Sequence, residues 1–463
     1  MTRESRGGAP GDPPSPAADL LLRRPDRGAR PVARAVVLAA WAVCTASALL
    51  YAVRFGGRMP VMDDWEMVPR LTGDSPVSFS WLWAQHNEHR IPLPRLVYLG
   101  LVGLTGDFRS GMILSVFLLS GAAAGSIAAM ASLRGRVSLA DAVFPLAILG
   151  LGQHKNLLWC FQLQMVLSAA LILAVLATIV RMPLRSDSRT AGLLFALLAA
   201  AILCGGVGAA FSPPIVAWLA IAGVARSAGS DPAQRRGGLA MIAAAAGLLA
   251  LLASVLVGFD RPRVLPASGG LFAAGRTSVQ FLGSGLAVAP RSAFSVAAVA
   301  VGGAWLATIA LLVRAGARGG DRPRALALLA FQLSMGSLAL GIGFARSGLG
   351  AEAGLESRYA TIAMPAICGI AMAWSLHSGS VAGRVASSAI LLFLAAAAVP
   401  NAREAIDFGT WWRSRMTELD LRVARGASPA DLVERFGDDL YPDPAILLRR
   451  MEMLRAARMG PFR

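Results

Sequence analysis

The run RAVVLAAWAVCTASALLYAVR, residues 34–54, is bounded by two arginines, and no charge interrupts residues 35–53. A helix needs about 20 mostly apolar residues to cross the hydrocarbon core of a bilayer, so this run is long enough to span a membrane. Runs of the same kind recur along the chain. We predict eleven spans, near residues 34–54, 110–133, 137–152, 162–180, 191–209, 211–225, 237–258, 292–313, 325–345, 359–377 and 383–399.

The overall composition agrees with a polytopic membrane protein. Of the 463 residues, 56 % are hydrophobic and only 15 % are charged, whereas a soluble protein carries about 25 % charged residues. This deficit excludes a soluble enzyme, a disordered chain and a coiled coil. The fold class that we predict is all-α, a membrane helix bundle. Two further apolar stretches, 92–106 and 271–289, contain or adjoin Pro, Gly and Arg, and each could be re-entrant, interfacial or a further span.

The basic residues predict the orientation of the bundle. The net charge is +17, and Lys155 is the single lysine among 44 basic residues. Arginines are densest in the N-terminal segment and in the short loops after every second span, which is the pattern of the cytoplasmic side. We therefore predict the N-terminus inside and, with eleven spans, the C-terminus outside; one miscounted helix would move the C-terminus inside. Because the arginines are split between short loops and both ends, nucleic-acid binding is not expected.

Composition divides the chain into three parts. Residues 1–33 are rich in Pro, Gly and Arg and lack apolar periodicity, which predicts a disordered cytoplasmic tail. Residues 34–399 form the membrane domain. Residues 400–463 are charged, and we predict that they form a small amphipathic helical tail on the outer membrane surface.

Two helix starts are visible in this C-terminal tail. Ser428-Pro429 and Asp443-Pro444 each place an N-cap residue before a proline at the first helical position. The second helix is predicted to run from Ala445 to about Met459, because its apolar residues recur at helical spacing.

The first outer loop, residues 55–96, has the most informative polar side chains. Asp63 and Asp64 lie just beyond the first span, and a second polar cluster, WLWAQHNEHR, follows at residues 81–90. Of two neighbouring carboxylates, one can act as a general base, because its like-charged neighbour raises its pKa. Both can instead hold a divalent cation, Mg²⁺ or Mn²⁺, that binds a phosphate. Solvated loop charges, or a helix cap formed by Asp64, are the structural alternatives.

The HNEHR run also permits a zinc hypothesis, because His86 and His89 are three residues apart. This hypothesis is the weaker one. Catalytic zinc normally takes three protein ligands, and the sequence has neither an HExxH motif nor cysteines nearby.

Two later outer loops place polar residues at the membrane boundary. In the second loop, Lys155, next to His154, either binds a phosphate or extends along the interface. Gln164 begins the following span and needs a polar partner or a cavity. In the loop before the tenth span, the fork of Arg358 could bind a lipid-linked phosphate; an interfacial anchor formed with Tyr359 is the alternative.

Together these segments resemble the polytopic glycosyltransferases of the GT-C superfamily, which include protein O-mannosyltransferases, aminoarabinose transferases and arabinofuranosyltransferases. The resemblance rests on the DD pair after the first span, the late ESRYATIAMP segment, and the HNEHR and LLWCFQLQ runs. It implies a polyprenyl-phosphate-linked sugar as donor and an envelope glycan, lipid or protein as acceptor. It also implies transfer with inversion at the outer face of a bacterial inner membrane.

The resemblance further implies roles for individual side chains. Asp63 or Asp64 would act as the general base, with Asp64 slightly favoured. The side chains that would hold the lipid phosphate are Arg358, Tyr359 and either His154 or Lys155. The indoles that could stack on a sugar or pack at the interface are Trp65, Trp81 and Trp83. The remaining substrate contacts that we predict are Glu66, His86, Glu88, His89, Arg346 and Glu356.

Two other functions stay open on the sequence. A transporter or flippase of a lipid-linked or anionic precursor would also have many spans and outer arginines, and a non-catalytic protein of envelope assembly would need no reactive site. A transporter should carry ionisable residues in mid-span, facing a path. Here the predicted span interiors are nearly free of charge, which favours chemistry at the outer face.

Overall fold

The computed structural model describes residues 29–182, 188–261, 266–287, 294–318 and 320–463. This part of the chain is predominantly helical, and its strands are β1 (Gln85–His86) and β2 (His89–Arg90). Eight of its helices are long and apolar enough to cross a membrane, which confirms the predicted all-α membrane helix bundle. They are α2 (Ala29–Phe55), α6 (Arg109–Arg134), α8 (Leu163–Arg181), α12 (Pro232–Leu256), α14 (Phe294–Ala317), α15 (Arg322–Arg346), α16 (Tyr359–His377) and α17 (Ser380–Ala424).

Shorter apolar helices lie between the long ones. They are α5 (Pro92–Thr105), α9 (Ser188–Leu203), α10 (Gly206–Phe211), α11 (Pro213–Ser227) and α13 (Leu271–Ser284). A 14-residue helix such as α5 is about 21 Å long, whereas the hydrocarbon core is about 30 Å thick. Helices α5 and α13, the described helices of the stretches 92–106 and 271–289, are therefore shorter than a straight span, and eight helices of the described residues are long enough for one.

The predicted span at 137–152 is not one helix. The chain there forms η2 (Leu139–Ala142), α7 (Val143–Ile148) and η3 (Leu151–Leu157), with extended backbone at Gly150. Broken backbone is tolerated at membrane depth only where protein surrounds it. That condition is met, because α7 packs against α2, α6, α16 and α17.

Helix α17 differs most from the sequence prediction. The whole helix has 45 residues and is about 67 Å long. It continues through Pro400, although we expected the span to end at residue 399. An internal proline costs roughly 3 kcal/mol or more, and packing of the following residues offsets this cost. Ala405 is fully buried, and its carbonyl accepts a 2.8 Å hydrogen bond from Tyr51 Oη. Trp412, farther along α17, is also buried.

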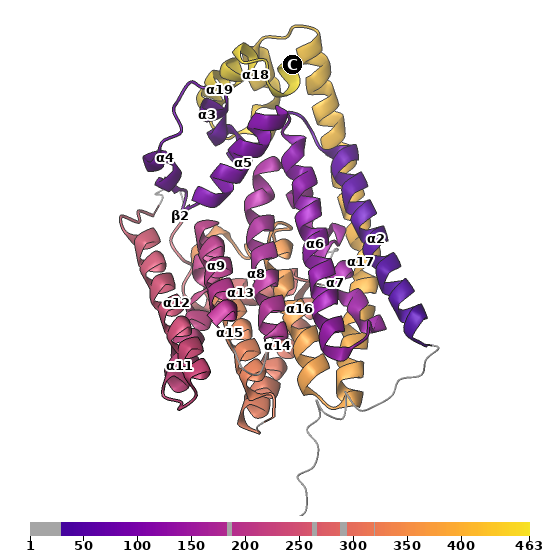
Figure 1. The fold of residues 1–463 in the computed structure, drawn as a ribbon. Helices are drawn as coiled ribbons and strands as arrows, with labels where there is room; N and C mark the ends of the chain where they lie inside the picture. The colour runs from indigo at the N-terminus through magenta and orange to yellow at the C-terminus, as the bar shows by residue number, and fades with distance from the viewer. Residues whose placement is uncertain (1–28, 183–187, 262–265, 288–293, 319) are drawn as a thin grey trace, which may run out of the picture.

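The segments beyond the bundle gather at one end of the molecule, opposite the start of α2 (Figure 1). Residues 56–108 and 425–463 form this structure, which we call the cap. Its C-terminal part contains α18 (Pro429–Leu440), α19 (Pro444–Ala456) and η7 (Gly460–Phe462). Both predicted helix starts are confirmed, since the Ser428 and Asp443 side chains accept hydrogen bonds from first-turn amides.

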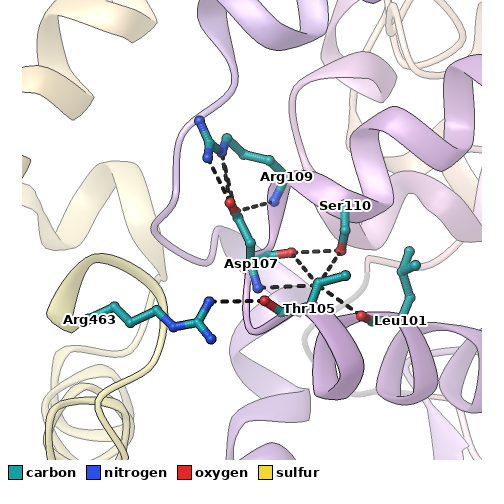
Figure 2. A network of polar contacts seen from close by, with 6 residues as sticks. All are labelled: Leu101, Thr105, Asp107, Arg109, Ser110 and Arg463. Carbon is teal, nitrogen blue, oxygen red and sulfur yellow. Dashed lines mark hydrogen bonds and ion pairs between the residues drawn. The ribbon is translucent and has the colours of Figure 1, made fainter.

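The two parts of the cap are joined by polar contacts. Glu66 of the first loop pairs with Arg450 of α19, with oxygen–nitrogen distances of 2.7 and 3.0 Å. Figure 2 shows a second polar contact between the two parts of the cap, in which Arg463 Nη1 donates to the Thr105 carbonyl at 3.0 Å. At the same turn Asp107 pairs with a neighbouring arginine and fixes the start of α6.

The start of α2 also differs from the prediction. The helix begins at Ala29, so residues 29–33 belong to it rather than to a tail. Pro31 suits this position, because proline is tolerated in the first turn of a helix. Residues 1–28 of the predicted tail lie outside the described residues.

Candidate functional site

The acidic pair lies on η1 (Met62–Met67), a short 3₁₀ helix where the cap meets the bundle, and its two members differ. Asp64 is 1 % exposed. Its Oδ2 accepts from the Val61 amide at 3.0 Å, and its Oδ1 accepts from Tyr98 Oη at 2.8 Å. Asp64 therefore caps the turn and joins it to α5. This arrangement supports the structural alternative for Asp64, in which its carboxylate caps a helical turn. The capped amide is that of Val61, and not one in a helix that starts at Trp65.

Burial raises the pKa of Asp64 to about 7, although the bonds from Val61 and Tyr98 oppose the shift. We expect Asp64→Asn to remove a pH dependence of stability. The raised pKa means that wild-type stability is full below about pH 4 and falls as pH rises through 7. The variant stays neutral, and its amide can accept from Val61 and donate to Tyr98. The free energy of unfolding of the variant minus that of wild type should therefore increase by roughly 2–4 kcal/mol from acid to alkaline pH.

Thermal unfolding in detergent at pH 5 and pH 8 measures this effect. The control is Asp74→Asn, which changes an exposed carboxylate of the same loop. Identical pH profiles for wild type and Asp64→Asn would contradict the assignment of Asp64 as a buried acid.

Asp63 differs from Asp64 in its exposure and in the direction of its pKa shift. Its side chain is 41 % exposed, and its Oδ1 lies 3.7 Å from His86 Nε2. Partial burial would raise the pKa of Asp63, but the neighbouring His86 ring and the Arg358 guanidinium lower it overall. Asp63 is therefore ionised at neutral pH and is the accessible member of the pair.

The HNEHR run forms the hairpin of β1 and β2, in which His86 and His89 are cross-strand partners. Asn87 takes the left-handed backbone (φ 48°) that a two-residue hairpin turn requires, and asparagine tolerates it well. His89 Nε2 lies 2.9 Å from the Gln164 amide nitrogen, so the partner predicted for this glutamine exists. Burial lowers the pKa of His89 to about 4, which keeps its ring neutral.

The tip of the hairpin is tied to the bundle by an ion pair. Glu88 Oε2 lies 2.6 Å from Arg346 Nη2, at the last residue of α15, and both side chains are largely buried. Two predicted substrate contacts therefore satisfy each other. They position the hairpin beside Asp63. Because the two charges neutralise each other, neither side chain is available to bind a charged ligand.

Arg358 is the predicted site residue that keeps its charge free. It precedes α16, in which every residue from Tyr359 to Ala373 is buried. The amide of Asn156 donates to the Arg358 carbonyl at 2.8 Å and fixes the backbone. Its guanidinium lies 5.6 Å from the Tyr359 ring centroid. Across the described residues, that guanidinium makes no hydrogen bond or ion pair, and its Nε is buried without a partner.

His154, Lys155 and Glu356 form a neighbouring group around a polar cavity of about 80 Å³. Lys155 Nζ lies 3.7 Å from Glu356 Oε2. The His154 ring packs on Phe408 of α17, with centroids 5.1 Å apart. Glu404 also lines this cavity. Phe408 and Glu404 were not predicted, because they follow Pro400, where we expected the membrane domain to have ended.

Three predicted contacts are occupied by other parts of the protein. Trp65 is fully buried, so it offers no face to a sugar. Tyr359 is 2 % exposed, with its ring 6.1 Å from that of Phe281. The Glu66 carboxylate is taken by Arg450 and by the Tyr441 hydroxyl. These side chains hold the site together rather than line it.

The other two tryptophans are half-buried in the cap. The Trp81 ring lies 4.7 Å from the Arg95 guanidinium. The Trp83 ring stacks on Phe79 at a centroid distance of 6.2 Å and an interplanar angle of 9°. Both indoles thus contact side chains within α4 (Phe79–Trp83) and its neighbours.

The metal hypotheses gain no support from the geometry. In the part of the chain that the structure describes, no three His, Cys, Asp or Glu side chains come together as a metal site would require. Both Asp64 oxygens already accept hydrogen bonds, so a cation shared by Asp63 and Asp64 would have to displace them. Binding of Mg²⁺ or Mn²⁺ at Asp63 alone stays a prediction.

Comparisons with known proteins do not assign a family to this arrangement. No protein-family model, curated protein or solved structure matches the chain. Its function is therefore argued from the geometry of the site and from the short motifs of the sequence.

Proposed function

We propose that the protein is a membrane glycosyltransferase of the GT-C type. It would move a sugar from a polyprenyl-phosphate donor to an envelope glycan, lipid or protein on the outer face of a bacterial inner membrane. One observation carries the proposal: the Asp63 carboxylate is accessible, and the Arg358 guanidinium, which lowers the pKa of Asp63, has no hydrogen-bond or ion-pair partner among the described residues. A base and an anion-binding group are the two parts that this reaction needs.

The reaction follows from these two groups. Asp63 accepts the proton of an acceptor hydroxyl as the hydroxyl oxygen attacks the anomeric carbon of the donor sugar. The bond between that carbon and the phosphate oxygen breaks, and its electron pair leaves with the polyprenyl phosphate. Attack opposite the leaving group inverts the anomeric centre. Arg358 binds the phosphate through its planar fork and stabilises the charge that develops on it.

The geometry favours Asp63 as the proposed base, although the sequence slightly favoured Asp64. A base must be within hydrogen-bond reach of its substrate, and Asp64 is buried with both oxygens occupied. His86 adjoins Asp63 and holds its carboxylate in place. The neighbouring Lys155 would help to attract the donor phosphate to the same boundary.

The distribution of charge favours this function over transport. In the eight long helices of the described chain, the charged side chains lie at or near the ends, apart from those in the part of α17 beyond Pro400. A transporter is expected to carry such groups in mid-span along its path. The polar groups collect instead where the cap meets the bundle, and this supports chemistry at that surface.

Arg358→Ala is expected to weaken the binding of polyprenyl monophosphate by roughly 10- to 100-fold, because charge-assisted bonds to the phosphate are lost. Arg358→Lys should bind with an affinity between those of wild type and Arg358→Ala, since lysine keeps the charge but not the bidentate fork. Binding is measured on purified protein in nanodiscs. The matched control is Arg425→Ala, which removes an exposed arginine of the cap.

The cellular counterpart uses a deletion strain and the linkage composition of its envelope glycans. Loss of one sugar in the deletion, restored by wild type but not by Arg358→Ala, supports the proposal and names the substrate. Unchanged glycans in the deletion strain, or full restoration by Arg358→Ala, would count against it and favour transport or assembly.

A further inference from the structure

A groove between α2 and α6 lies at the opposite end of the bundle from the cap, where α2 begins and α6 ends (Figure 1). Its volume is about 550 Å³. The wall is apolar, and the rim carries two arginines. The lining residues that matter here are Arg34, Leu38 and Trp41 from α2, Ala124 and Ala128 from α6, and Arg136 from the turn that follows.

The two helices are joined on the cap side of this groove. Trp41 Nε1 donates to the Ser120 carbonyl at 3.1 Å, and the hydroxyls of Thr45 and Ser120 share a 2.9 Å hydrogen bond. The Trp41 indole thus closes the inner end. At the outer end Gly135 terminates α6 in the left-handed conformation (φ 65°). The groove therefore extends between Trp41 and the two arginines.

The charges at the arginine end of the groove are available to a ligand. Arg34 and Arg136 are both exposed, and within the described residues neither guanidinium has a hydrogen bond or an ion pair. The apolar wall is itself partly open, since Leu38 is 44 % exposed.

We propose that this groove binds a membrane phospholipid with an anionic head group. The lipid phosphate would lie between Arg34 and Arg136, and an acyl chain would follow α2 toward Trp41, a distance of about 10 Å along the helix. Charge complementarity selects the occupant, because two unpaired arginines attract an anionic head group, whereas a zwitterionic one brings a cation to them. Basic pockets between membrane helices bind acidic lipids in this way. The inference is independent of the proposed transferase activity.

Native mass spectrometry of the full chain, with added phosphatidylglycerol or phosphatidylcholine, tests the proposal. Wild type should prefer phosphatidylglycerol. The double variant Arg34→Gln plus Arg136→Gln should bind it about 25-fold more weakly, since each arginine contributes roughly fivefold. Its binding of phosphatidylcholine should not change. Ala128→Phe fills the groove without altering charge and should weaken the binding of both lipids.

The matched control is Arg235→Gln plus Arg236→Gln, which removes two exposed arginines from the first turns of α12. It should bind phosphatidylglycerol as wild type does. Equal binding of the two lipids by wild type, an unchanged preference in the Arg34 and Arg136 double variant, or the same loss in the control would each overturn the proposal. Melting temperatures of all variants separate lost binding from lost folding.

Discussion

Asp63→Asn is expected to lower the rate of sugar transfer by about 100-fold or more, while the protein remains folded and still binds the donor. A general base typically contributes 10²- to 10⁴-fold, and the amide of the variant cannot take the acceptor proton. Donor binding should persist, because the phosphate is held by Arg358. The side chain of Asp63 is 41 % exposed, so the isosteric change should leave the fold intact.

The rate is measured with purified protein in nanodiscs, using the donor that the glycan analysis identifies. Asp74→Asn, an exposed acid of the same loop, should transfer at the wild-type rate. Transfer by Asp63→Asn within a few fold of wild type would refute the assignment of the base. If Asp64→Asn instead abolished transfer without loss of stability, the roles of the two acids would be reversed.

Features set by neighbours in the sequence were predicted well. Apolar runs identified the long helices, because burying such runs away from water decides their environment before any tertiary contact forms. The starts of α18 and α19 were found from Ser428-Pro429 and Asp443-Pro444, since a cap needs only its own first turn. Both are confirmed by hydrogen bonds from first-turn amides.

Features set by distant contacts could not be predicted. Helix α17 passes through Pro400 because residues such as Ala405 and Trp412 are buried beyond it. No local sequence pattern predicts that packing. The difference in burial between Asp63 and Asp64 has the same cause. Asp64 is buried because Tyr98, 34 positions later, donates to it.

The sequence selects candidate residues for the site but not their arrangement. Sequence chemistry selected the acids, histidines and arginines of the outer loops, but it could not tell which charges neutralise one another. Glu88 pairs with Arg346, whereas the Arg358 guanidinium has no hydrogen-bond or ion-pair partner in the described part of the chain. Such pairings join segments far apart in the chain, so only the fold separates side chains that hold the site from those that face a ligand.

Arg450→Ala is expected to release the C-terminal part of the cap from the first loop and to lower stability by about 2 kcal/mol. Arg450 binds Glu66 through both nitrogens of its fork, and the two side chains are 15 % and 32 % exposed. This burial places the pair between a surface ion pair, worth up to about 1 kcal/mol, and a buried pair, whose disruption costs 3–5 kcal/mol. Arg450→Lys should cost less, because it keeps the charge.

This pair also predicts a response to acid. Burial alone would raise the pKa of Glu66, but the bonds from Arg450 and Tyr441 lower it overall. Its stabilisation is therefore present above the ordinary glutamate value of 4.5 and is lost as pH falls below it. Limited proteolysis between pH 7 and pH 4 should cut the wild-type cap faster as pH falls. In Arg450→Ala the cap should be cut quickly at both pH values.

The neighbouring Arg449→Ala is the matched control, since Arg449 is exposed on the same helix and should behave as wild type. A double-mutant cycle with Glu66→Gln isolates the coupling between the two side chains. Because Glu66 follows Asp63 by one 3₁₀ turn on η1, Arg450→Ala should also slow transfer, through misplacement of the base. Equal protection of the cap in Arg450→Ala and wild type would show that contacts other than the Glu66–Arg450 pair hold α18 and α19 in place.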